Sequence, residues 1–354
     1  MASAFMILMA NMSSPNLLES KAQPLVSVCM ITYNHEPYIA QAIEGVLTQQ
    51  TAFPFELIIG EDCSTDGTRK IVFSYQKKYP DVIRVVTSGK NVGSKMNSFR
   101  TEEACQGKYI AYCEGDDYWH DPQKLQMQVE ILESNPEVSL VHSEHDLLET
   151  KSGRRIFCFH KYCGRLHAAA DDPDNFFVDV ITYKYHIVTC TVCIRASLMH
   201  RLRKADTVLY ADKRFPIGDM QRWGELSRIG KFVYTNKSLA MCRVLAESMS
   251  HTANLQKYVV LRCKSTDLQL YLCAKYNIPE GTMKRVRDLQ VFKHNCYAIV
   301  TGDRNTVERL HSDPKFHFAW HQELLRMMGR YNSTRMLAKF ALYFWLKYVV
   351  KRLS

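Results

Sequence analysis

Residues 107–119 read GKYIAYCEGDDYW, an apolar, β-rich run that ends in three carboxylates within four positions. Glu114, Asp116 and Asp117 follow the run directly, which places them at the end of a strand. Three neighbouring negative charges repel one another unless a cation neutralises them. Mg²⁺ and Mn²⁺ accept carboxylate oxygens together with phosphate oxygens. The stretch therefore predicts a divalent-cation site for a phosphate-bearing ligand, with an acidic surface turn as the plain alternative.

Strands and helices alternate on both sides of this stretch. Apolar β-rich runs predict strands at about 25–30, 55–59, 82–86, 109–113 and 138–141. Helical spacing and capping residues predict helices after Pro37, after Gly67, at about 96–104 and after Pro122. This alternation predicts an α/β fold, Rossmann-like, with a mainly parallel sheet covered by helices on both faces.

The pattern is weaker further along the chain. Residues 152–185 show little periodicity and are expected to form an insertion or a loop. A β-rich stretch is expected at 186–195, followed by a helix at about 219–230. Two short strands are expected, one near Phe232 and one at 239–243.

Polar clusters at 32–35, 61–67 and 114–117 each follow a predicted strand. In parallel sheets ligands bind beyond the carboxyl ends of the strands, because the connecting loops converge there. We therefore expect these three clusters to meet at one edge of the sheet.

The first two clusters contain groups suited to a nucleotide. A carboxylate at Asp62 can accept a hydrogen bond from a base N–H or a ribose hydroxyl, although Asp before Ser or Thr is also ordinary helix capping. Thr32, Tyr33 and Asn34 can supply hydroxyls and a stacking ring, or be simple turn residues. The residues alone leave both interpretations open.

Five motifs in series resemble the family 2 glycosyltransferases with a GT-A fold. The resemblance covers about residues 25–250, and the order, spacing and strand context of the motifs agree with that family. They are VSVCMITYNHEPYIAQAIEGVLTQQ at 26–50, ELIIGEDCSTDGT at 56–68, NVGS at 91–94, GKYIAYCEGDDYW at 107–119 and GDMQRWGELSRIGKFVYTNKSLAMCRV at 218–244.

The resemblance implies a role for each matching position. Asp62 falls where the family reads the nucleobase, with Tyr33 near the base. Asp116 falls at the ribose or phosphate contact, and Asp117 at the metal ligand. Asp219 occupies the position of the catalytic base of inverting members. A carboxylate that opens a helix at the ligand edge can deprotonate an acceptor hydroxyl, or can simply stabilise the helix N-terminus.

Two positions depart from the family pattern. Glu114 stands where many relatives have Asp, and its longer side chain can reach the metal or point to solvent. Relatives often carry a histidine two residues after the arginine of a YRxH-like motif, whereas here Arg243 is followed by Val244 and Leu245. His251 lies too far along the chain to replace that histidine.

Length and motif limits predict three regions: an N-terminal tail at 1–24, a GT-A catalytic domain at 25–251 and a helical C-terminal region at 252–354. The first residues lack a basic leader and a cleavage site, so no secretory signal is expected. No run of about eighteen apolar residues predicts a membrane span.

The net charge and the cysteines indicate which partners and which cellular compartment to expect. There are 46 Lys and Arg against 36 Asp and Glu, a net charge of +10, which favours anionic partners. We find no nucleic-acid-binding motif and expect no nucleic acid partner. Cysteines within apolar runs favour a reducing compartment, so the protein is expected to be cytoplasmic. A basic stripe within 333–354 suits the inner, anionic face of a membrane, or a helix packed on the catalytic domain.

These observations predict a metal-dependent, inverting transfer of a sugar from a nucleoside-diphosphate sugar, UDP-linked by family weighting, with Mn²⁺ or Mg²⁺ as cofactor. The acceptor is expected to be the hydroxyl of a glycan or a lipid-linked intermediate in surface polysaccharide synthesis. Adjacent carboxylates disfavour a glycoside hydrolase, which needs carboxyls on opposite sides of the bond. A nucleotidyltransferase would usually need a glycine-rich phosphate loop after the first strand, and this sequence shows none there, although that activity stays an alternative. A non-catalytic sugar-nucleotide-binding subunit is the other alternative.

Overall fold

The protein is described from a computed structural model of the chain. The described residues are 23–164, 171–212, 214–215, 218–245, 254–303 and 305. The predicted N-terminal tail and the basic stripe within 333–354 lie outside the described residues, apart from residues 23–24.

The first half of the chain builds a parallel sheet. Its strands lie in the order β3-β2-β1-β4, and all three pairings are parallel. The elements are β1 (Val26–Thr32), α1 (Ile39–Leu47), β2 (Phe55–Glu61), α2 (Thr68–Lys78), β3 (Ile83–Thr87), α3 (Ser94–Glu103) and β4 (Tyr109–Tyr112). Each predicted strand and helix of this half is present, so the α/β prediction is confirmed.

The second half extends the same sheet with mixed pairing. Beyond β4 the order continues β8-β6-β9-β5, where only β6 and β9 pair in parallel, and β7 pairs with β6. The elements are β5 (Tyr118–Trp119), α4 (Lys124–Ser134), β6 (Val138–Glu149), β7 (Arg155–Ile156), α5 (Phe159–Tyr162), α6 (Pro173–Ile181), η1 (Thr189–Thr191), β8 (Cys193–Arg195), α7 (Ala196–Ala205), α8 (Thr207–Ala211), α9 (Gly218–Ser227) and β9 (Lys231–Val244). The sheet is therefore parallel throughout its first four strands and mixed beyond them.

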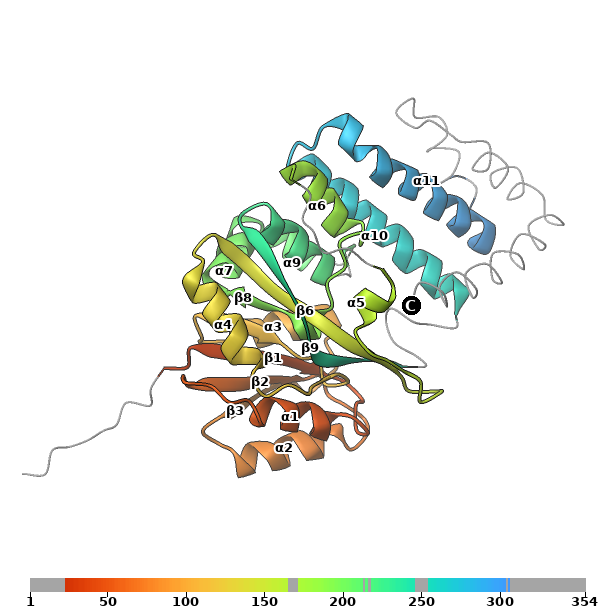
Figure 1. Ribbon diagram of the computed structural model, residues 1–354. Helices are drawn as coiled ribbons and strands as arrows, with labels where there is room; N and C mark the ends of the chain where they lie inside the picture. Colours follow the sequence, from red (N-terminus) through yellow and green to blue (C-terminus); the bar gives the residue numbers. More distant parts are fainter. Residues whose placement is uncertain are drawn as a thin grey trace, which may run out of the picture.

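Helices cover both faces of the sheet (Figure 1). Successive residues of β1 point to opposite faces. Val28 packs in the core cluster that contains residues of α1, α2 and α4, whereas Cys29 packs in the cluster formed with α6, α7 and α9. The near-continuous apolar run of β1 follows from this burial on both sides.

Three local predictions are wrong. Residues 152–185, expected to be an insertion or loop, contain β7, α5 and α6. Asp172 caps α6 by accepting the Asp174 backbone N–H, and Pro173 takes the first helical position. The β-rich stretch at 186–195 is a strand only at its end, because η1 interrupts it. The two short strands after α9 are one strand, β9.

The helical C-terminal region is confirmed over its described part. The helices α10 (Leu255–Lys275) and α11 (Glu280–Thr301) lie side by side next to α6 (Figure 1). Leu268 and Leu272 of α10 pack with Phe177 and Ile181 of α6. The predicted boundary at 251 falls among residues 246–253, outside the described residues, and stays a prediction. None of the described helices is long and apolar enough to span a membrane.

Gly45 sits where α1 crosses β5 and allows a close contact. A Cβ atom added at Gly45 would lie 2.6 Å from the Trp119 carbonyl oxygen and 3.0 Å from the Trp119 backbone nitrogen. We expect Gly45→Ala to lower the free energy of unfolding by about 1–3 kcal/mol, because backbone must shift to admit the methyl group. Denaturant unfolding measures this. Gly89→Ala is the control, since nothing lies within 4 Å of its added Cβ, and equal effects at both positions would contradict the packing argument.

Candidate active site

The acidic loop 114–117 lies against the end of β1. The backbone N–H of Gly115 donates to the Ile31 carbonyl at 2.9 Å, and that of Asp117 donates to the Glu114 carbonyl at 3.0 Å. A Cβ at Gly115 would lie 2.8 Å from both Cβ and Oγ1 of Thr32. Glycine is therefore required for the loop to approach this closely. The predicted meeting of the first and third polar clusters is seen in this contact.

Arg243 of β9 fixes the loop from the other side. Its backbone N–H donates to Asp117 Oδ1 at 2.7 Å, and its guanidinium donates to the Asp116 carbonyl at 2.6 Å and to the Gln41 side chain of α1. The guanidinium also lies over the Tyr118 ring, 4.5 Å from the centroid. The sequence marked Arg243 only as the start of an incomplete motif, and its role in holding the loop was missed.

The three carboxylates are crowded and partly withdrawn from water. Burial, and then the charge of Asp116, raises the pKa of Glu114 from 4.5 to about 7. Burial and the charges of Asp116 and Glu114 also raise the pKa of Asp117 well above its ordinary value. Oε2 of Glu114 is buried and accepts no hydrogen bond from any described residue. Negative charge without a compensating donor is what a bound cation relieves.

The loops after β1 and β2 are joined to each other. Asn34, whose φ of 55° is left-handed, donates its N–H to Ser64 Oγ and accepts the Thr65 N–H at 2.8 Å. Tyr33 is 41% exposed and can offer a ring to a ligand. Thr32 Oγ1 is buried and forms no hydrogen bond with the described residues. The structure thus brings Thr32 to the acidic loop, while Asn34 links the loop after β1 to the loop after β2.

Asp62 is buried at the end of β2 and holds a third loop. Its two carboxylate oxygens accept the backbone N–H groups of Val92 and Gly93, each at 2.9 Å. Arg100 of α3 lies 3.4 Å from the same carboxylate. The predicted contact of Asp62 with a nucleobase stays a prediction. The structure adds a second role, because Asp62 fixes the NVGS motif next to β2.

Asp219 lies at the start of α9. Its Oδ1 accepts the backbone N–H of Met220 at 2.7 Å. The Asp219 charge is one of the causes that raise the pKa of Glu114, after burial and Asp116, so the two carboxylates lie within electrostatic range. The predicted base is therefore on the same side of the molecule as the acidic loop.

Two basic residues hold α9 and the segment before it, and neither was predicted from the sequence. Lys95 Nζ donates to the carbonyls of Leu209, Asp212 and Phe215 at 3.3, 2.9 and 2.9 Å. Arg222 of α9 pairs with the buried carboxylate of Glu102 in α3. Their partners lie more than a hundred residues away, so no local spacing reveals them.

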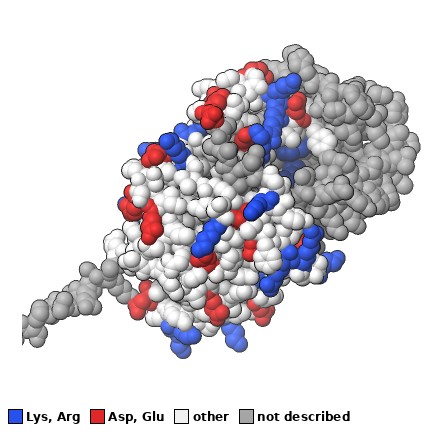
Figure 2. Space-filling model, in the orientation of Figure 1, with Lys and Arg blue, Asp and Glu red and all other residues white. Residues whose placement is uncertain are grey.

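Basic and acidic side chains of the described residues are interspersed over the face drawn in Figure 2. The described part of the chain has exposed ion pairs, such as Lys108 with Glu133 at 2.8 Å. Exposed pairs of this kind contribute little to stability.

Residues 27–198 match the family model described as Glycosyl transferase family 2. The match spans the four parallel strands, the acidic loop and the polar loops around it. This part of the chain is therefore a glycosyltransferase family 2 domain, and the resemblance inferred from the motifs is confirmed.

Curated relatives match a limited part of the chain. An uncharacterized protein of Mycobacterium tuberculosis is 43% identical over 115 residues, which are 32% of this chain and 33% of that protein. The Bacillus subtilis protein named "Putative teichuronic acid biosynthesis glycosyltransferase TuaG" is 39% identical over 110 residues, 31% of this chain and 42% of TuaG. The chain thus matches less than half the length of either relative.

A solved structure covers more of the chain. The crystal structure of S. aureus TarS 1-349 aligns with a TM-score of 0.53 at 15% identity, and covers 86% of this chain and 79% of that chain. At this identity the likeness establishes the fold, which is the predicted GT-A type with a helical C-terminal region.

The raised pKa of Glu114 predicts a pH-dependent stability. In the metal-free protein the folded state binds a proton that the unfolded state releases above pH 4.5, so stability is lost as pH rises towards about 7. We expect Glu114→Gln to become progressively more stable than wild type from pH 5 to pH 8. Urea unfolding in EDTA measures this, and added Mn²⁺ should reverse the order by stabilising the wild-type carboxylate.

Glu130→Gln, an exposed change on α4, is the matched control. A stability difference between Glu114→Gln and wild type that is independent of pH would contradict the raised pKa of Glu114.

Proposed function

We propose that this protein transfers a sugar from a nucleoside-diphosphate sugar to an acceptor hydroxyl, with inversion at the anomeric carbon. The observation that carries the proposal is the crowded carboxylate loop 114–117 at the carboxyl end of the parallel strands of a glycosyltransferase family 2 domain. A UDP-linked donor is favoured because TarS, which has the same fold, has been crystallised with UDP-GlcNAc and with UDP.

Asp117 and Glu114 are the residues proposed to hold a divalent cation, Mn²⁺ or Mg²⁺. Their all-oxygen chemistry suits a hard ion, and the Glu114 oxygen that accepts no hydrogen bond from the described residues is available to it. When bound, the cation would neutralise charge on the diphosphate leaving group. Asp116 is proposed to contact the ribose or a phosphate, since its carboxylate is the more exposed of the two aspartates.

The nucleoside end of the donor is assigned to the neighbouring loops. Tyr33 offers its exposed ring to the base, and Asp62 a carboxylate oxygen to a base N–H. Thr32 and Asn34 shape the wall between them, through the Gly115 contact and the bonds to Ser64 and Thr65. Binding by Asp62 requires that it share an oxygen with the amide of Val92 or Gly93.

Asp219 is proposed as the general base. Its carboxylate takes the proton of the acceptor hydroxyl while that oxygen bonds to the anomeric carbon and the bond to the diphosphate oxygen breaks. Lys95 and Arg222 position this base by tying α9 and the preceding segment to α3.

The acceptor is proposed to be a glycan or lipid-linked intermediate of a surface polysaccharide, in line with the biosynthetic role given in the name of TuaG. The proposed contact of residues 333–354 with an anionic membrane, and a cytoplasmic location at its inner face, agree with such an acceptor.

The experiment is a panel of UDP- and GDP-sugars tested by thermal shift with Mn²⁺ and with Mg²⁺, followed by assay of nucleoside diphosphate release. We expect one donor to raise the Tm only when metal is present. Release should require an acceptor fraction, and Asp117→Asn should abolish the metal-dependent shift. A donor that binds but is never turned over with any acceptor would instead indicate a non-catalytic binding subunit.

Asp219→Asn separates binding from chemistry. We expect the variant to keep the metal-dependent donor shift and to lose turnover by about 10²–10⁴-fold, because the amide cannot accept the proton. Steady-state kinetics and donor titration measure the two quantities. Asp288→Asn, an exposed change on α11, is the matched control and should leave kcat unchanged. Near wild-type turnover in Asp219→Asn would reject Asp219 as the base.

A further inference from the structure

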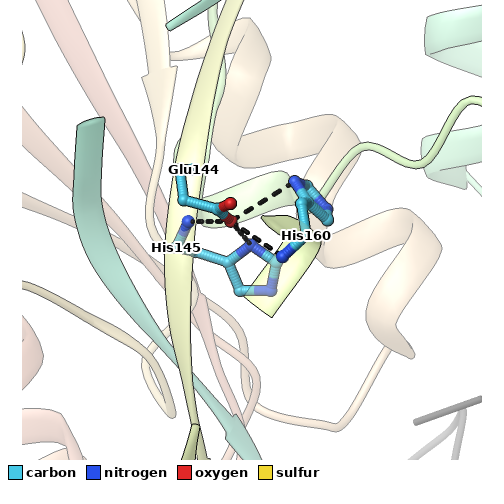
Figure 3. A group of neighbouring side chains, drawn as sticks. All are labelled: Glu144, His145 and His160. Atoms are coloured by element: carbon cyan, nitrogen blue, oxygen red, sulfur yellow. Dashed lines mark hydrogen bonds and ion pairs between the residues drawn. The ribbon is translucent and has the colours of Figure 1, made fainter. Parts of the chain in front are cut away.

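A second group of potential metal ligands lies away from the acidic loop. Glu144 and His145 are on β6, and His160 is in α5, which folds back onto that strand. The three side chains are no more than 1% exposed. One ligand atom from each lies within 4.8 Å of the others. Figure 3 shows both imidazoles reaching toward the Glu144 carboxylate.

The distances suit a small ion. Nδ1 of His145 lies 3.7 Å from Glu144 Oε1, and Nδ1 of His160 lies 3.5 Å from the same oxygen. Ligands about 2.0–2.1 Å from a tetrahedral Zn²⁺ are separated by roughly 3.3–3.4 Å. The two distances to Glu144 need to shorten by only a few tenths of an ångström. The two histidine nitrogens lie within 4.8 Å of each other, and their rings must turn towards the ion for all three atoms to bind it.

The carboxylate is held in place by surrounding donors. Glu144 Oε1 accepts the backbone N–H groups of His145 and His160 at 2.9 and 3.0 Å. Glu144 Oε2 accepts the Lys161 backbone N–H at 2.9 Å and the Tyr234 hydroxyl at 3.1 Å. Hydrogen bonds of this type orient ligating carboxylates in metal sites. They also permit a simpler interpretation, in which Glu144 only caps the start of α5, and the experiment below decides between the two.

The opposite ring nitrogen of His160 points to the metal interpretation. Nε2 of His160 lies 3.0 Å from Nδ1 of His186. A ligating histidine commonly donates its second ring N–H to a neighbouring acceptor, which fixes the tautomer. In the tautomer that carries its proton on Nε2, His160 donates to His186 and directs the lone pair of Nδ1 towards Glu144. The His145 ring stands edge-on to His160, with centroids 4.6 Å apart.

We propose that Glu144, His145 and His160 bind a Zn²⁺-type transition-metal ion, separate from the ion proposed at Asp117. Two imidazoles and one carboxylate favour zinc over Mg²⁺, whereas the oxygen-only loop 114–117 has the opposite preference. The ion links β6 to α5 across fifteen positions of the chain, from His145 to His160. Its role is to fasten α5 and β7 to the sheet, because the ligands are too buried to meet a substrate.

The test is the metal content of the full-length protein, purified without chelator and dialysed after loading with Zn²⁺. We expect on the order of one zinc per chain in the wild type. His145→Asn and His160→Asn should lose it, while Asp117→Asn and the exposed surface change His200→Asn should keep it. Zinc retained by both histidine variants, or wild type that holds none after loading, would overturn the proposal.

A histidine variant that fails to fold would also lose zinc, so the site is tested on the wild-type protein as well. Co²⁺ replacing zinc at a site with imidazole ligands gives visible absorption, and we expect it at about one equivalent. Chelation should then lower the Tm by several degrees, because an ion bound to the native state stabilises it. Mg²⁺ in excess should not restore the Tm. Absence of the Co²⁺ bands would count against the site whether or not the donor assay succeeds.

Discussion

The hydrogen bond from the Arg243 backbone to Asp117 is the constraint on which the site depends. It joins the acidic loop, which follows β4, to β9, which lies between β6 and β5 in the far half of the sheet. The same residue reaches Gln41 on α1 and the Asp116 carbonyl. Neighbouring carboxylates are thereby kept close enough to raise one another's pKa. Burial of this loop raises the pKa of Glu114, and the energetic cost of that charge supports the proposal that the loop binds a cation.

The sequence predicted the parallel half of the sheet because its strands are rich in apolar residues and helix α1 has one apolar stripe. It failed on α6 for a physical reason. Phe176 and Val180 face one core cluster, while Phe177 and Ile181 face another. The apolar part of this nine-residue helix is short and follows the polar stretch 171–175, so the sequence offers too few turns for a helical period to be recognised.

The length of β6 was missed for the opposite reason. The apolar pattern stops at Val141, but the strand continues to Glu149 along β9, with His142, Ser143 and Glu144 buried. Buried polar residues in a strand look like a loop in the sequence, and their partners lie in distant segments. The acidic loop was predictable because its charges are adjacent in sequence. The supports provided by Arg243, Lys95 and Arg222 were not, because they exist only once the chain has folded.

Helix α3 touches both ends of the proposed reaction. Arg100 lies at Asp62, Lys95 holds the segment that precedes Asp219, and Glu102 binds Arg222 of α9. The proposed donor side and the proposed acceptor side of the site are therefore both held in place by helix α3. A chimera that exchanges only the 152–218 region between relatives would separate that region from the helix that positions it. Acceptor specificity should be transferable only when the matching α3 is exchanged with it.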